Sequence, residues 1–196
     1  MTTTEDQRIS YLPVPTEDTA HEGVKKLWAK AQANMGFVPN VFSAYAHRPE
    51  RFSAWFNHFR QVTEPSETLS GADREMIAVV ASGINRCTYC LVSHGQALRH
   101  ELHDEANADR ITFNWRHAEL SERQRAICAF VEKLTSAPAT VERSDVDALA
   151  AAGLGPDDIW DVVELTAMYN FTNRISSALG IVPNAEYHSL DRAPID

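Results

Sequence analysis

Two cysteines, a histidine and a glutamate have the types and spacing that thiol chemistry needs. The cysteines lie three residues apart in Cys87-Thr88-Tyr89-Cys90, His94 follows four residues after the second, and Glu75 precedes the first by twelve. A thiolate can attack the O–O bond of a peroxide and become a sulfenic acid, and a second thiol can then displace water to form a disulfide. An external dithiol must reduce that disulfide by exchange. The pattern therefore predicts a redox site.

A helix that begins at Cys87 would position three of these side chains. Cys87, Cys90 and His94 are then spaced i, i+3 and i+7, so they share one face. Both cysteines fall in the first turn, where unpaired N–H groups and the positive end of the helix dipole favour a thiolate. An antiparallel helix hairpin folded at about Asn85 would bring Glu75 beside His94. A carboxylate, an imidazole and a thiol would then lie in order for proton transfer.

Two other interpretations fit the cysteine pair. Cys87, Cys90 and His94 with a water molecule could hold zinc, with His100 or His103 as a further ligand, although the second C-x-x-C of common zinc sites is absent. The pair could also be purely structural. We favour redox chemistry and expect neither a metal nor another cofactor.

Two further side chains, one inside the motif and one outside it, bear on this hypothesis. Tyr89 could orient the substrate or a proton, but packing or gating is the better prediction. Cys128 lies in the apolar segment Ala-Ile-Cys-Ala-Phe, which is typical of a buried structural cysteine.

Composition restricts the class of protein. The chain has 196 residues, 44% of them hydrophobic, and a formal net charge of −9. We expect a single domain over residues 1–196, with an N-terminal arm at 1–17 and a C-terminal tail at 183–196. The negative charge argues against nucleic acid or an anionic membrane as a partner. No secretory signal or membrane-spanning run is evident, so we expect a cytoplasmic location, where thiols stay reduced.

The hydrophobic periodicity predicts an all-α fold. We expect helices at about 18–36, from 38, from 49, at 70–84, from 87 to about 102, from 121 to about 134, at 144–153 and at 156–179. Residues 104–115 are polar and ambiguous. Leu69–Ile77 faintly resembles Leu120–Cys128, which leaves an internal duplication open.

The motif resembles a known family. Glu75, eleven intervening residues and then Cys87-x-x-Cys90-x-x-x-His94 are similar to the AhpD-like alkylhydroperoxidases of the carboxymuconolactone decarboxylase superfamily. Three further segments resemble its uncharacterised peroxidase-related branch: Gly36-Phe37-Val38-Pro39-Asn40, Asn85-Arg86-Cys87 and Tyr169-Asn170-Phe171-Thr172-Asn173-Arg174-Ile175. The resemblance covers most of the chain, from about 11 to 181.

The resemblance implies an AhpD-like helical fold whose central antiparallel hairpin carries the C-x-x-C motif. It also implies a homo-oligomer (dimer, trimer or hexamer) that reduces hydrogen peroxide or organic hydroperoxides. Cys90 would attack, Cys87 would resolve, and Glu75 and His94 would relay protons. The electron donor would be an external dithiol or disulfide reductase. Better-studied members carry a second histidine at the position of Tyr89, so that histidine's role has no counterpart here.

Two competing functions remain open. A decarboxylase or lactone-processing enzyme of the same superfamily would need an anion-binding pocket, for which Arg74, Arg86 and Arg174 are candidate cations. A redox sensor would use the disulfide to switch its assembly, with negligible turnover.

Overall fold

The structure, a computed structural model, describes residues 8–193, so positions 1–7 of the expected arm and 194–196 of the expected tail lie outside the described residues. Within this range the chain forms nine α-helices, three 3-10 helices and no strand, which confirms the all-α prediction. The α-helices are α1 (Glu22–Met35), α2 (Asn40–Tyr45), α3 (Pro49–Thr63), α4 (Gly71–Ile84), α5 (Thr88–Leu102), α6 (Glu105–Asn114), α7 (Glu122–Ser136), α8 (Arg143–Ala151) and α9 (Pro156–Ala178). The 3-10 helices are Trp115–His117, Pro138–Thr140 and Ala185–His188.

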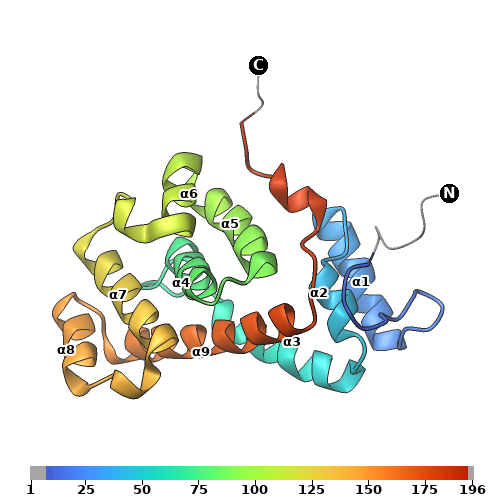
Figure 1. The fold of residues 1–196 in the computed structure, drawn as a ribbon, viewed down its shortest axis with the longest axis horizontal. Helices are drawn as coiled ribbons and strands as arrows, with labels where there is room; N and C mark the ends of the chain where they lie inside the picture. The colour runs from blue at the N-terminus through green and yellow to red at the C-terminus, as the bar shows by residue number, and fades with distance from the viewer. Residues whose placement is uncertain (1–7, 194–196) are drawn as a thin grey trace.

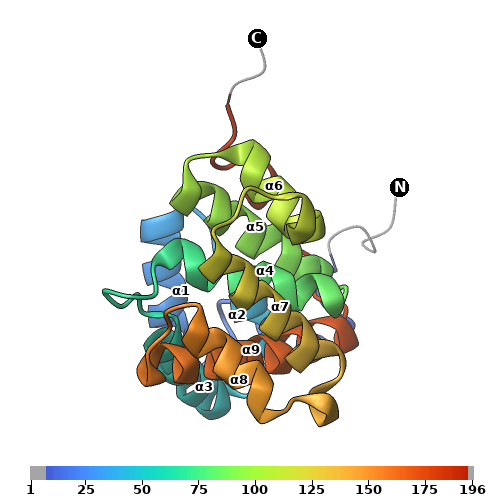
Figure 2. The ribbon, with the colours of Figure 1, turned by 90° about the vertical axis from the view of Figure 1, so that its left-hand side faces the viewer.

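Helix α4 lies at the centre of the fold because it is apolar on nearly every side. Residues 76–82 are all buried, and α5, α6, α7 and α9 pack around them. Figure 1 shows α1, α2 and α3 at one end of the molecule and α7 and α8 at the other, with α9 running between them. The 23 residues of α9 span about 34 Å. Figure 2 gives the view from the α7 and α8 end.

Helix starts follow local capping chemistry. Ser70 caps α4 as predicted, and its hydroxyl accepts from the Asp73 N–H at 3.1 Å while the Asp73 carboxylate accepts from the Ser70 N–H at 3.2 Å. Ser121 caps α7 through the same kind of reciprocal pair with Gln124. The ambiguous polar segment is helical, because the Asp104 side chain caps α6. These boxes satisfy N–H groups that have no partner within the helix.

Two helix starts differ from the sequence-based prediction. Helix α1 begins at Glu22 rather than near Asp18, because residues 16–20 form a turn closed by the Ala20 N–H on the Thr16 carbonyl at 2.8 Å. Helix α8 begins at Arg143 rather than after a cap at Ser144. Its cap is Glu142, whose N–H donates to Asp145 at 2.7 Å.

Two segments of nearly identical sequence form a contact that we call the VPN clasp. Gly36-Phe37-Val38-Pro39-Asn40 follows α1, and Gly180-Ile181-Val182-Pro183-Asn184 follows α9. The Asn40 side chain donates to the valine carbonyl of the other segment at 2.8 Å, and the Asn184 side chain does the same in return at 2.9 Å. The Asn184 side-chain oxygen also accepts the Asn40 N–H at 2.7 Å. The clasp therefore ties α2 to the end of α9.

Both terminal segments, where described, lie against the helices. The Tyr11 N–H donates to the Leu179 carbonyl at 2.7 Å at the end of α9. The buried Arg99 of α5 donates to the carbonyls of Tyr187 and Leu190 at 3.0 and 3.2 Å. The expected C-terminal tail thus holds a 3-10 helix against α5. Among residues 8–193, no helix has both the length and the apolar character needed to cross a membrane.

Candidate active site

A sharp turn between α4 and α5 sets the position of the first cysteine. Arg86 has a φ of 52°, in the left-handed region. Its N–H donates to the Gly83 carbonyl at 3.1 Å, and the Cys87 N–H donates to the Ser82 carbonyl at 3.0 Å. This pair of bonds is the Schellman motif, in which glycine usually takes the left-handed position. The turn ends α4 and makes Cys87 the N-cap of α5.

The two thiols are in contact inside the protein. Cys87 and Cys90 are free cysteines with only 1% and 3% of their surfaces exposed. Their Sγ atoms lie 2.7 Å apart, and the Cys90 N–H also donates to Cys87 Sγ at 3.4 Å. A disulfide bond has an S–S length of about 2.05 Å. Only a small displacement would therefore be needed to form one.

The two thiols differ in acidity. A hydrogen bond from the Cys90 thiol lowers the pKa of Cys87 to about 7, against the effect of burial and with help from the Cys90 N–H, the Ser177 hydroxyl and the charge of His94. The same hydrogen bond and burial raise the pKa of Cys90 well above its ordinary value. The helix start and this hydrogen bond therefore favour the negative charge on Cys87 rather than on Cys90.

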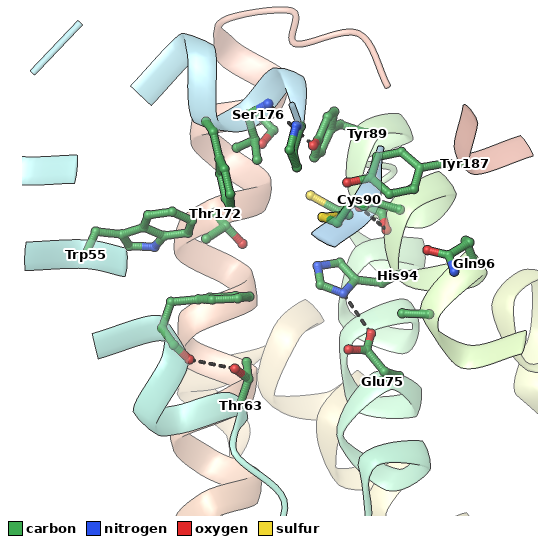
Figure 3. Close-up of a pocket in the computed structure, with 17 residues that line it drawn as sticks. Trp55, Thr63, Glu75, Tyr89, Cys90, His94, Gln96, Thr172, Ser176 and Tyr187 are labelled. Carbon is green, nitrogen blue, oxygen red and sulfur yellow. Dashed lines mark hydrogen bonds and ion pairs between the residues drawn. The ribbon is translucent and has the colours of Figure 1, made fainter. Parts of the chain in front are cut away.

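Glu75 and His94 form a hydrogen-bonded pair next to the thiols. Glu75 Oε2 lies 2.8 Å from His94 Nδ1, so the other ring nitrogen is left for proton exchange. Figure 3 shows His94 between Cys90 and Glu75. The imidazole and the ring of Tyr169 pack in a T-shaped arrangement, with ring centres 4.8 Å apart. The carboxylate and the aromatic ring together fix the orientation of the imidazole.

Helix α9 adds polar groups that the sequence analysis did not assign to the site. Asn173 and Ser176 both lower the pKa of Cys90, although burial and Cys87 outweigh them. Asn173 also accepts from Asn85 at 2.9 Å and donates to Ser82 at 3.0 Å, which connects α9 to the turn before Cys87. Part of this signal was in the segment Tyr169–Ile175, because Tyr169 and Asn173 share one helical face, which continues to Ser176. The sequence did not show which helix would pack against this face of α9.

Tyr89 has a packing role in the structure. Its side chain is 5% exposed, and its hydroxyl accepts the Val41 N–H of α2 at 3.4 Å. Its ring meets that of Tyr187 nearly at right angles, with centres 6.4 Å apart. Tyr89 therefore joins α5 to α2 and to the C-terminal 3-10 helix while also forming part of the cavity wall.

A cavity of about 290 Å³ gives access to the site. Four of the predicted site residues line it, namely Glu75, Tyr89, Cys90 and His94, whereas Cys87 is not among the described residues that do so. The rest of the lining is mostly apolar and comes from several helices: Met35, Pro39, Val41, Phe42, Trp55, Phe59, Thr63, Ser93, Gln96, Ala97, Thr172, Ser176 and Tyr187. Figure 3 shows Trp55 across the cavity from His94. A small molecule in this cavity would meet Cys90.

The additional residues that the alternative interpretations invoked are not among the described residues that line the cavity. Within residues 8–193, no three His, Cys, Asp or Glu side chains gather as a set of metal ligands. Neither His100 nor His103 is among the described residues that line the cavity.

The candidate cations of a decarboxylase, Arg74, Arg86 and Arg174, are likewise absent from the described lining of the cavity. Arg74 is buried against Asp161 at 2.6 Å.

Cys128 is 1% exposed, as expected of a structural cysteine, and burial raises its pKa to about 12.

Comparisons with a family model and with solved structures point to the same family. Residues 49–133 match the model of the carboxymuconolactone decarboxylase family. An uncharacterized peroxidase-related protein from Silicibacter sp. TM1040 shares 38% identity, with a TM-score of 0.91 over 97% of this chain and 100% of its own. An alkylhydroperoxidase AhpD core from Ralstonia eutropha JMP134, also an uncharacterized peroxidase-related protein, shares 34% identity, with a TM-score of 0.91 over 96% and 100%.

A more distant structure shares only the fold. The debrominase Bmp8 has 18% identity and a TM-score of 0.73, over 93% of this chain and 95% of its own. The fold alone therefore does not determine the reaction. No match was found among curated proteins.

Proposed function

This chain belongs to the AhpD-like branch of the carboxymuconolactone decarboxylase superfamily, and from that membership we propose that it is a thiol-dependent peroxidase. Its substrates would be hydrogen peroxide or organic hydroperoxides, and Cys87 and Cys90 would pass through a disulfide. One observation carries the proposal: Cys90 lines a cavity together with His94 and Glu75, while its Sγ touches Cys87 Sγ at 2.7 Å.

The first step would be attack by Cys90, because its sulfur faces the cavity. The hydrogen shared by the sulfurs moves to Cys87, which leaves a thiolate on Cys90. This thiolate attacks the terminal oxygen of the hydroperoxide, so an S–O bond forms and the O–O bond breaks. The alkoxide that leaves takes a proton from His94, whose positive charge Glu75 stabilises. The products are an alcohol and a sulfenic acid on Cys90.

Cys87 would then resolve the sulfenic acid. His94, now neutral, takes the proton of the Cys87 thiol. The Cys87 sulfur attacks Cys90 Sγ, the S–O bond breaks, and the hydroxide leaves as water with that proton, which His94 passes to it. An external dithiol or disulfide reductase restores both thiols by exchange and is itself oxidised to a disulfide. Per turnover, one hydroperoxide and one dithiol give one alcohol, one water molecule and one disulfide.

Self-association into a homo-oligomer is part of the same proposal, and light scattering would measure the size of the assembly.

Counting free thiols before and after one equivalent of hydroperoxide tests the cycle. Wild type should lose two thiols, and the Cys128→Ser control should lose the same two. Sulfenic acid should be trapped in Cys87→Ser, where Cys90 remains, but not in Cys90→Ser. Three unreactive thiols in wild type would refute the mechanism. Thiol loss with a change in oligomer size but no turnover with any dithiol would instead support a redox sensor.

A further inference from the structure

A second and larger cavity lies beside the one that holds the thiols. It has a volume of about 920 Å³ and is bordered mainly by α1 and α3. Helix α3 forms part of both cavities, because Phe52 and Phe56 line the larger one while Trp55 and Phe59 line the thiol cavity. Residues four apart lie on the same face of a helix, so Phe52 and Phe56 share one face of α3 while Trp55 and Phe59 share another. The two cavities therefore adjoin along α3.

The larger cavity has an apolar interior and a basic rim. Val24, Ala31 and Phe52 are buried in its wall. The exposed rim carries three cations and one carboxylate, namely Lys26, Lys30, Arg60 and Glu50, together with His21. None of the three cations forms a direct ion pair with another described residue, although the charge of Lys26 also acts on the Glu22 carboxylate one helical turn away. This local excess of positive charge stands out on a chain with a net charge of −9 and would attract an anion.

Two side chains connect this cavity to the thiol site. Met35 and Phe42 line both cavities. Met35 is 41% exposed, and its flexible thioether can move to let a ligand pass. Along α1 the lining runs from Gly23 to Met35, a rise of about 18 Å at 1.5 Å per residue. A ligand held at Lys26 and Lys30 would therefore have its chain directed along the apolar wall toward the thiols.

The size of the thiol cavity also points to a large substrate. Its 290 Å³ is far more than a hydrogen peroxide molecule needs, since one water molecule occupies about 30 Å³ in the liquid. Part of its wall is aromatic, with Phe42, Trp55 and Phe59. Such a wall favours a hydrocarbon chain.

We infer that the substrate is the hydroperoxide of a long-chain carboxylic acid, such as a fatty-acid hydroperoxide. Its carboxylate would lie at the rim formed by Lys26, Lys30 and Arg60, its chain would pass Met35 and Phe42, and its O–O bond would lie beside Cys90. The inference rests on the proposed peroxidase cycle and adds no new step to it. The O–O bond breaks as described above, the external dithiol supplies the two electrons, and the product is the corresponding hydroxy acid.

The test compares linoleic acid hydroperoxide with its methyl ester, which has the same chain without the charge. Wild type should have a higher kcat/KM for the acid. In Lys26→Ala/Lys30→Ala the ratio of the acid value to the ester value should fall about tenfold, as expected for the loss of two exposed ion pairs, and the loss should appear in KM. Lys25→Ala is the matched control, because Lys25 lies on the same helix but pairs with Glu22 at 3.0 Å and does not line the cavity. Its ratio should equal that of wild type.

Three outcomes would overturn the inference, and they can be told apart. Equal kcat/KM for acid and ester in wild type, with turnover of tert-butyl hydroperoxide, would refute the substrate class and leave the peroxidase function intact. No turnover of any hydroperoxide would refute the proposed function and the substrate class with it. A change in oligomer size in Lys26→Ala/Lys30→Ala, with an unchanged ratio, would show that a second copy of the chain covers the cavity. Thermal unfolding of the variant checks that it is folded.

Discussion

Replacing Cys87 by alanine should slow the first oxidation of Cys90, although Cys87 is expected to act only in the second step. The two sulfurs lie 2.7 Å apart, close enough to share one proton when the pair carries a single negative charge. When the charge is on Cys90, the Cys87 thiol can donate a hydrogen bond to it, in addition to the hydrogen bonds of Asn173 and Ser176. Alanine removes this donor and leaves Cys90 as a lone buried thiol. Burial raises the pKa of such a thiol, because it disfavours the charged form.

The size of the effect follows from the pKa values. The pair loses its first proton near pH 7, so about half of the molecules carry a thiolate at that pH. A lone thiol with the ordinary value of 9.0 is only about 1% ionised at pH 7. Sulfenic acid formation should therefore slow by as much as about 50-fold at pH 7, and by less in proportion to the share of the charge that lies on Cys87 in wild type; it should recover about tenfold per pH unit as the pH rises.

The assay is single-turnover oxidation of Cys90 by excess tert-butyl hydroperoxide, followed by quenching and mass spectrometry from about pH 6 to about pH 10. Wild-type rates should rise with pH through a midpoint near 7 and then level off. Cys87→Ser should lie between wild type and Cys87→Ala, since a hydroxyl can still donate a hydrogen bond. A Cys87→Ala profile that matched wild type in both midpoint and rate at pH 7 would show that the shared proton has no part in activating Cys90.

Three further predictions concern the residues around the thiols. Glu75→Gln should slow sulfenic acid formation by about 100-fold, as is usual for loss of acid–base assistance, while the exposed Glu67→Gln should match wild type; equal rates in the two variants would leave Glu75 a structural residue. Asn184→Ala removes two hydrogen bonds of the VPN clasp and should lower the free energy of unfolding by about 1–3 kcal/mol, against little change for the exposed Asn57→Ala in denaturant titrations. Arg86→Gly should be more stable than Arg86→Ala by about 1 kcal/mol, because glycine adopts a positive φ without steric cost; equal denaturation midpoints would argue against strain at this turn.

Most helices could be predicted from local chemistry. Capping serines, prolines in first turns and glycines at helix ends act within a few residues, so their effect is readable in the sequence. The same capping rules predicted the wrong starts for α1 and α8. The turn before Glu22 and the bond from Glu142 to Asp145 compete with the caps that the sequence suggested.

The faint likeness between Leu69–Ile77 and Leu120–Cys128 has a limited structural counterpart. Both segments begin a helix with a capping box, and α4 and α7 pack against each other. The more informative repeat is the VPN clasp. The sequence of each of its two segments, taken alone, predicts only an ordinary turn after a helix. Their pairing depends on side chains that are 144 residues apart in the chain.

For the site, the sequence by itself determined the reactive groups. The spacing of Cys87, Cys90 and His94 on one helix, and a hairpin that returns Glu75 to His94, follow from helical geometry and chain connectivity. Only the tertiary structure decided which thiol faces the cavity and where the shared proton lies. Those properties depend on burial and on α9 residues such as Ser176, which approach the thiols from more than eighty positions away. Solvation and through-space contacts of this kind are set by packing, and no local pattern encodes them.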